Sequence, residues 1–161
     1  MATVSQLLAT KGQTVHAIGK MATVFEAIEK MVAQNVGALL VIEDGVIEGG
    51  GTGRLGRIRP CGMLTERDYL RKVALQGRAS RTTLVHEIMT NRLISVHLDT
   101  AIEGCMELMT RNRIRHLPVF DGAELAGLVS IGDIVKYLAH DRQAQIEQLT
   151  AYIQGGEMAH A

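Results

Sequence analysis

The stretch "GMLTERD", Gly62 to Asp68, recurs later in the chain as "GLVSIGD", Gly127 to Asp133. Both copies follow the pattern G-h-h-[ST]-x-x-D, where h is an apolar residue and x is any residue. The apolar residues indicate the end of a buried strand, and Thr or Ser is a favoured N-cap for a helix that begins directly after it. The repetition therefore predicts a chain built from two similar strand-to-helix units.

The similarity continues upstream, where "TVFEAIEKMVAQNVGALLVIEDG" from Thr23 resembles "TAIEGCMELMTRNRIRHLPVFDG" from Thr100. Each copy begins with the pattern of a capping box, Thr-x-x-Glu, in which Thr and Glu satisfy free amides at a helix start. Short apolar strands, a D-G turn and a return strand follow in both. The lead-in segments "VSQLLAT" and "VHEIMT" also agree. Each unit thus reads as β-α-β-β-α, with one sheet face left to bury.

We therefore predict an α/β protein with two pseudo-symmetric repeats, over residues 1–80 and 81–140, packed through their sheets. A helix closes each repeat, from Glu66 to Gln76 and from Ile131 to His140. For residues 141–161 we predict a separate C-terminal amphipathic helix and a tail. The helix would pack on the repeats or on a second copy of the chain. Its apolar stripe consists of Ile146, Leu149, Tyr152 and Ile153.

The composition restricts the function classes. The chain has 161 residues, and its 17 Lys plus Arg balance 17 Asp plus Glu. A neutral chain gives no electrostatic basis for bulk binding to nucleic acid or to an anionic membrane. Cys61 and Cys105 are the only cysteines, and we interpret them as buried thiols in a reducing compartment. Without a long apolar run, we expect a cytoplasmic protein that does not attach to membranes.

The first hairpin is about 13 residues longer than the second, and the excess lies within residues 45–60. This insertion contains G-x-G-x-x-G, a pattern also found in dinucleotide-binding turns. Such a turn needs a helix directly after it, whereas this stretch leads into a predicted strand and Pro60 opposes a helix. We interpret it as a solvated loop or as a cationic arm over a ligand or partner. The cations of that arm would be Arg54, Arg57 and Arg59.

The duplicated motif also suggests a chemistry. Asp at the third helical position is compatible with a purely structural cap, because an acid there suits the helix dipole. The choice of Asp in both copies favours a further role, since a short carboxylate at a helix start can accept both hydroxyls of a ribose. The free amides of the same helix start can bind a phosphate. Two such sites would suit a nucleotide-binding protein.

These motifs, with "VHEIMT" and "RIRHLPV", resemble those of tandem cystathionine-β-synthase (CBS) domains of the stand-alone type, over about Val4 to Tyr137. The resemblance implies clefts between two repeats that bind adenosine-containing ligands: AMP, ADP, ATP, NAD or S-adenosylmethionine. It also implies a disc-shaped homodimer. The implied ligand contacts are Val15, His16, Val36, Gly37, Ala38, Thr65, Arg67 and Asp68 in the first repeat, and Ile94, Ser95, Ile114, Arg115, His116, Pro118, Ser130 and Asp133 in the second.

The resemblance also implies a role for each motif residue. Asp68 and Asp133 would hold ribose hydroxyls, with the adjacent Thr65 and Ser130 reaching the ribose or the α-phosphate. Arg67 would neutralise phosphate in the first repeat, whereas Gly132 stands at the matching position of the second. The two clefts should therefore differ in affinity.

We expect no catalytic residues and no metal site, because the repeats use almost the whole chain and no nucleophile–base or metal-ligand spacing occurs. The predicted function is a regulatory, signal-transduction module that binds an adenine nucleotide and modulates a partner or its own assembly. A scaffold or nucleic-acid-binding module with degenerate clefts is the alternative, although the basic run Arg111 to His116 lacks interleaved aromatic residues. An NAD-dependent enzyme is the least favoured interpretation.

Overall fold

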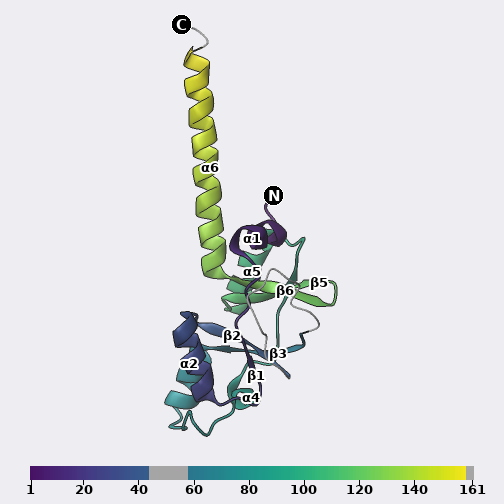
Figure 1. Ribbon diagram of the computed structural model, residues 1–161, viewed down its shortest axis with the longest axis vertical. Coiled ribbons are helices and arrows are strands. Elements are labelled where there is room, and N and C mark those ends of the chain that lie inside the picture. The colour runs from purple at the N-terminus through teal and green to yellow at the C-terminus, as the bar shows by residue number, and fades with distance from the viewer. Residues whose placement is uncertain (44–57, 159–161) are drawn as a thin grey trace.

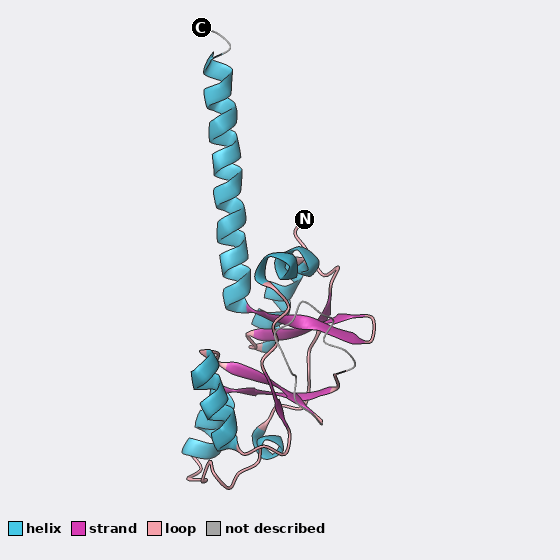
Figure 2. Cartoon of the chain, in the orientation of Figure 1, coloured by secondary structure: helices cyan, strands magenta, loops and turns pink. Residues whose placement is uncertain are grey.

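The computed structural model describes residues 1–43 and 58–158, so the predicted turn at residues 44–45 and most of the 45–60 insertion lie outside the described residues. The first unit contains a parallel pair and an antiparallel pair of strands, and the second unit repeats this arrangement (Figure 2). The elements in chain order are α1 (Val4–Lys11), β1 (Ala17–Gly19), α2 (Val24–Gln34), β2 (Ala38–Ile42), β3 (Pro60–Thr65), α3 (Glu66–Tyr69), the π-helical η1 (Leu70–Ala74), α4 (Val85–Ile88), β4 (Val96–His97), α5 (Ile102–Asn112), β5 (His116–Asp121), β6 (Glu124–Ser130) and α6 (Ile131–Met158).

The two sheets have matching topologies, which confirms the predicted α/β repeats. In the first sheet β1 runs parallel to β2, and β2 pairs with β3 in antiparallel fashion. In the second sheet β4, β5 and β6 stand in the same relations. The predicted D-G turn joins β5 to β6, and Gly122 has a φ of 61°, which a glycine adopts readily.

The predicted capping box is present in the first repeat and absent from the second. At the start of α2 the Thr23 hydroxyl accepts from the Glu26 amide at 3.1 Å, and the Thr23 amide donates to the Glu26 carboxylate at 2.8 Å. The prediction for the second repeat is wrong, because α5 begins one residue later, with Ala101 as its N-cap. The Thr100 hydroxyl instead accepts from the His97 amide at 3.1 Å.

The lead-in helix of each repeat packs on the other repeat. The Val4 amide of α1 donates to the Thr100 carbonyl at 2.9 Å, next to the start of α5. In the same way the Val85 amide of α4 donates to the Ala22 carbonyl at 2.8 Å, next to the start of α2. The apolar side chains of α1 belong to the core of the second unit, and those of α4 belong to the core of the first. This exchange joins the two repeats into one structure.

A third apolar cluster lies where the two sheets face each other, as predicted. It combines Ala38, Leu40 and Met63 of the first sheet with Leu125 and Leu128 of the second. All five side chains are buried. Burial of apolar area between the sheets stabilises the pair of repeats relative to separate units.

The two cysteines are unpaired thiols. Cys105 is fully buried, as predicted, whereas Cys61 is only partly buried. Burial raises the pKa of both thiols above the ordinary value.

The C-terminal region differs from the prediction. The helix that closes the second repeat does not end at His140, because α6 continues without a break from Ile131 to Met158. Neither Gly nor Pro interrupts the sequence around residues 140–142. The sequence therefore contains no helix-ending residue at the predicted boundary between the two helices. Figure 1 shows α6 beginning at the end of β6 and its later part projecting beyond α1, away from the two sheets. Among the described residues, no helix combines the length and the apolarity that a membrane span requires.

Candidate functional site

Both motif copies place a strand end directly before a helix start, with the same reciprocal cap. In the first, the Thr65 amide donates to the Asp68 carboxylate at 3.0 Å, and the Thr65 hydroxyl accepts from the Asp68 amide at 3.3 Å. In the second, the corresponding distances between Ser130 and Asp133 are 2.8 Å and 3.1 Å. The structural role of the motif is therefore present in both repeats.

The first glycine of each motif copy has a steric role. A Cβ on Gly62 would lie 2.5 Å from the Met89 sulfur, just after α4. A Cβ on Gly127 would lie 3.0 Å from a methyl carbon of Leu8 in α1. A side chain at either position would therefore require the exchanged lead-in segment to shift, by more at Gly62 than at Gly127. The glycine of each motif copy thus leaves room for the lead-in segment that packs against it.

The carboxylate of Asp68 is enclosed by neighbours within the first half. The side chain is 12% exposed, and its Oδ1 lies 3.4 Å from both the Thr90 hydroxyl and the Lys72 Nζ. Its Oδ2 accepts from the Thr65 amide. Both oxygens therefore already have donors, which come from the end of β3, from η1 and from the segment after α4.

The carboxylate of Asp133 has a different partner, which comes from the other end of the chain. The Lys11 ammonium, at the end of α1, donates to the Asp133 Oδ2 and to the Leu128 carbonyl. Burial raises the pKa of the Asp133 carboxyl. The hydrogen bonds from Lys11 and from the Ser130 amide together outweigh this effect, so the pKa lies below its usual value. Asp133 is thus held ionised, with 22% of its side chain exposed.

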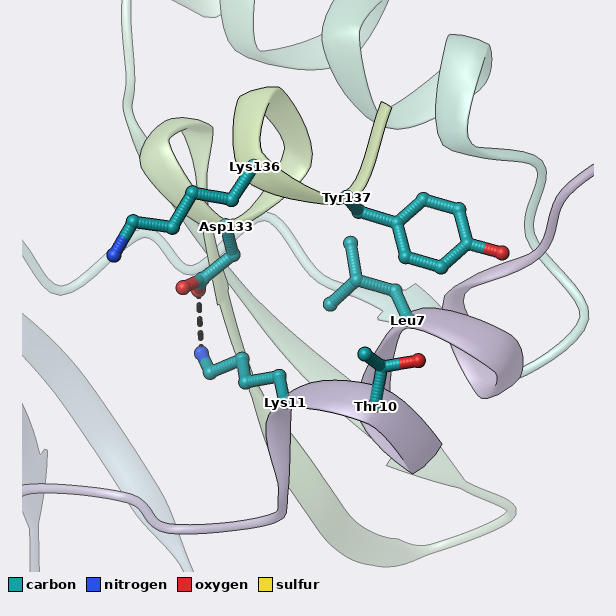
Figure 3. Close-up of a pocket in the computed structure, with 6 residues that line it drawn as sticks. All are labelled: Leu7, Thr10, Lys11, Asp133, Lys136 and Tyr137. Carbon is teal, nitrogen blue, oxygen red and sulfur yellow. Dashed lines mark hydrogen bonds and ion pairs between the residues drawn. The ribbon is translucent and has the colours of Figure 1, made fainter. Parts of the chain in front are cut away.

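A pocket of about 300 Å³ opens beside this ion pair, between α1 and α6 (Figure 3). Figure 3 shows the Lys11 and Asp133 side chains meeting at one side of it, with the Lys136 side chain above them. Its lining consists of Leu7, Thr10, Lys11, Asp133, Lys136 and Tyr137. The pocket therefore combines two ammonium groups, one carboxylate, two hydroxyls and apolar surface. This set can hold an anionic group next to a hydrogen-bonding diol.

Two histidines border the same region. Burial, opposed by Asp133 and reinforced by Lys11 and Arg115, lowers the pKa of His116. Burial, together with the charges of Lys30 and Lys11, lowers the pKa of His16. Both imidazoles are therefore neutral near pH 7, and each can donate and accept one hydrogen bond.

The strand pairing brings the other predicted residues to the two helix starts. Ala38 lies opposite Thr65, and the Gly37 carbonyl accepts from the Glu66 amide at 3.1 Å. In the second half His116 lies opposite Ser130, and the Arg115 carbonyl accepts from the Ile131 amide at 2.9 Å. Each predicted group of motif and strand residues is therefore contiguous in space.

The remaining predicted residues are divided between the core and the surface. Val36 and Ile114 pack against the cores of the first and second units, and Ile94 packs against the second core. Val15 belongs to the cluster between the sheets, and Pro118 is buried in β5. Surface positions are occupied by Arg67 and Ser95. Arg67 lies on α3, directly before Asp68.

Sequence reasoning missed Lys11, Lys72 and Lys136. Lys72 and Lys136 stand four and three residues after the two motif aspartates, so helical spacing alone could have indicated them. Lys11 lies 122 residues before Asp133. Only the exchange of α1 onto the second repeat brings Lys11 to this site.

Comparison with known proteins agrees with the fold and the motifs. The CBS-domain family model matches residues 9–49 and 85–140. The chain is 40% identical over 160 residues to the mitochondrial CBS domain-containing protein CBSX3 of Arabidopsis thaliana, covering 96% of this chain and 73% of the relative. A CBS-domain protein of Burkholderia ambifaria, named as a candidate signal-transduction protein, superimposes with a TM-score of 0.76 at 41% identity, over 87% of this chain and 96% of that one.

A hexameric CBS-CP12 protein from bloom-forming cyanobacteria is also similar, with a TM-score of 0.66 at 28% identity, over 84% of this chain and 70% of that one. The similar proteins thus include one named for signal transduction and one that is hexameric. The family model covers more than half of the chain, and the duplicated motif lies where the two repeats meet. The chain belongs to the CBS-domain family.

Proposed function

We propose that the protein is a non-catalytic regulatory module that binds an adenine nucleotide, AMP, ADP or ATP, at the second motif. The observation that carries this proposal is the ionised Asp133 beside a pocket that also contains Lys11 and Lys136. A carboxylate at this position can accept ribose hydroxyls, while the two ammonium groups can bind phosphate. NAD and S-adenosylmethionine share the adenosine part and are weaker candidates, since the pocket favours negative charge.

The two halves should differ in affinity. The Asp68 carboxylate is 12% exposed and accepts from Thr65, Thr90 and Lys72, so a ribose would have to displace internal donors. Asp133 is more exposed, and its main partner Lys11 can exchange the carboxylate for a phosphate. We therefore place the tighter nucleotide site at the second motif.

Calorimetric titration with AMP, ATP and NAD tests this proposal. Asp133→Ala should weaken AMP binding by roughly 10–150-fold, which corresponds to the loss of a charge-assisted hydrogen bond of about 1.5–3 kcal/mol. Asp68→Ala should leave the tighter site within about threefold of the wild type. The control is Glu147→Ala, further along α6 and outside the pocket lining. Absence of binding by the wild-type protein at millimolar nucleotide would exclude this function.

The proposed regulatory output is a change in the activity of a partner or in self-assembly. The name of the Burkholderia relative and the hexameric state of the cyanobacterial one support this class of function. The predicted disc-shaped homodimer belongs to the same proposal, and sedimentation with and without nucleotide would measure it. The predicted cytoplasmic location stays a prediction, since the Arabidopsis relative is named as mitochondrial.

A further inference from the structure

The C-terminal half of α6 is not covered by the rest of the described chain. Ile134 is fully buried against the second unit, but every residue from Arg142 to Gln154 is exposed. Figure 1 shows this part of the helix extending away from α1 and the sheets. Isolated helices of this length are marginal in water, because most helical stability in proteins comes from the packing of an apolar face. An intermolecular contact along the exposed face would supply that packing.

The exposed face carries a regular apolar stripe. Its positions alternate in steps of four and three residues, which is the spacing of the a and d positions of a coiled coil. The stripe consists of Val135, Ala139, Arg142, Ile146, Leu149 and Ile153. Its four large apolar members are between 56% and 63% exposed. The stripe lies about 100° around the helix from Ile134, so it begins beside the body and continues along the projecting part.

We propose that a second copy of this chain packs along the stripe, antiparallel to the first, with the two-fold axis between Ile146 and Leu149. In this arrangement Ile146 of each copy meets Leu149 of the other, so the same surface serves both chains. Arg142 of one copy then lies at the level of Ile153 of the other, whereas Val135 and Ala139 lie outside the paired stretch. The stretch from Arg142 to Ile153 is therefore complementary to itself.

The charge of Arg142 selects the antiparallel orientation. In a parallel pair the two Arg142 side chains would meet inside an apolar seam, where like charges repel and are poorly hydrated. In the antiparallel pair they are about 16 Å apart along the axis, since eleven residues separate them at 1.5 Å per residue. This distance exceeds the screening length of roughly 8–10 Å in physiological salt. Each guanidinium then lies near Tyr152 of the other copy, whose ring can bind a cation.

This interface is separate from the proposed nucleotide site. None of the six stripe residues lines the pocket between α1 and α6. The contact is also proposed separately from the predicted disc-shaped homodimer. Failure of nucleotide binding would therefore leave this proposal intact, and the reverse also holds.

Disulfide trapping in the full-length protein tests both the contact and its direction. Arg142→Cys and Ile153→Cys chains, one of them with an added mass tag, are mixed and oxidised. The antiparallel seam predicts at least tenfold more mixed disulfide between positions 142 and 153 than self-linked product from either variant alone. Gln148→Cys mixed with Arg142→Cys is the control, because position 148 lies on another face of the helix. Wild-type protein reports any background from Cys61 or Cys105.

The proposal is overturned if the mixture of Arg142→Cys and Ile153→Cys yields no more mixed disulfide than the Gln148→Cys control. A helix that binds a different protein would give this result. Efficient self-linking of each variant alone would indicate a parallel pair and would overturn the antiparallel arrangement. Circular dichroism of each variant verifies that α6 remains folded. Sedimentation of Ile146→Lys gives a second measurement, in which weaker self-association supports the contact and unchanged self-association contradicts it.

Discussion

Substitution of Lys11 by Met separates the recognition of phosphate from the recognition of ribose at the second motif. In the structure the Lys11 ammonium donates to Asp133 and to the Leu128 carbonyl. A ribose that binds Asp133 must displace this ammonium, and a nucleotide phosphate gives the ammonium a new anionic partner. Adenosine offers no such replacement. Lys11 should therefore favour AMP and disfavour adenosine, and Lys11→Met should reverse both effects while keeping a long apolar stem.

The magnitude follows from the strength of one charge-assisted hydrogen bond. Its loss costs about 1.5–3 kcal/mol, so AMP affinity should fall roughly 10–150-fold. Adenosine affinity should stay the same or rise, because Asp133 is no longer paired. The preference for AMP over adenosine should thus fall at least about tenfold.

Calorimetric titration of both ligands against wild type, Lys11→Met and Lys136→Met measures this preference. Lys136 lines the same pocket, so its substitution should weaken AMP less and leave adenosine binding unchanged. An equal loss of AMP and adenosine binding in Lys11→Met would refute the reasoning, since it would mean that Lys11 only supports the local structure. Unchanged AMP binding would refute it as well.

Three further predictions concern stability, each measured by urea unfolding. Glu26→Ala should destabilise the protein by roughly 0.5–2 kcal/mol through loss of the α2 capping box, while Glu103→Ala should cost only a few tenths, because Thr100 does not cap α5; equal losses would contradict this difference. Gly62→Ala should cost about 1–3 kcal/mol, because the new Cβ would lie 2.5 Å from the Met89 sulfur. The Cβ of Gly104→Ala would meet only a Thr100 methyl at 3.7 Å, so this variant should stabilise α5 by roughly 0.5–1 kcal/mol. The pKa of His116 is lowered, so its contribution to stability is present above pH 6.5 and is lost as the pH falls below that value. The urea midpoint should therefore decrease between pH 7 and pH 5, and His116→Gln should reduce that decrease. An equal decrease in the variant would exclude His116 as its source.

Local sequence patterns predicted most of the secondary structure because the forces involved are local. The Thr23 cap and the D-G turn at Asp121 each depend on residues within about four positions of one another. The prediction was wrong at Thr100. Thr23 precedes the first residue of β2 by 15 positions, whereas Thr100 precedes the first residue of β5 by 16, so Ala101 is the position equivalent to Thr23. Val24 and Ile102 occupy equivalent first positions of α2 and α5, and burial of Ile102 sets the true helix start.

The sequence by itself determined the duplicated α/β unit, the strand-to-helix motif and the candidate aspartates, since spacing and residue type specify these without reference to distant residues. Only the tertiary structure decided which unit each lead-in helix covers, because both lead-in segments are similar enough in sequence to suit either sheet. That exchange brings Met89 and Leu8 against Gly62 and Gly127, and it places Lys11 beside Asp133, 122 residues away. Long-range packing of this kind leaves no periodic signal in the sequence, because it depends on complementary surfaces and not on spacing along the chain.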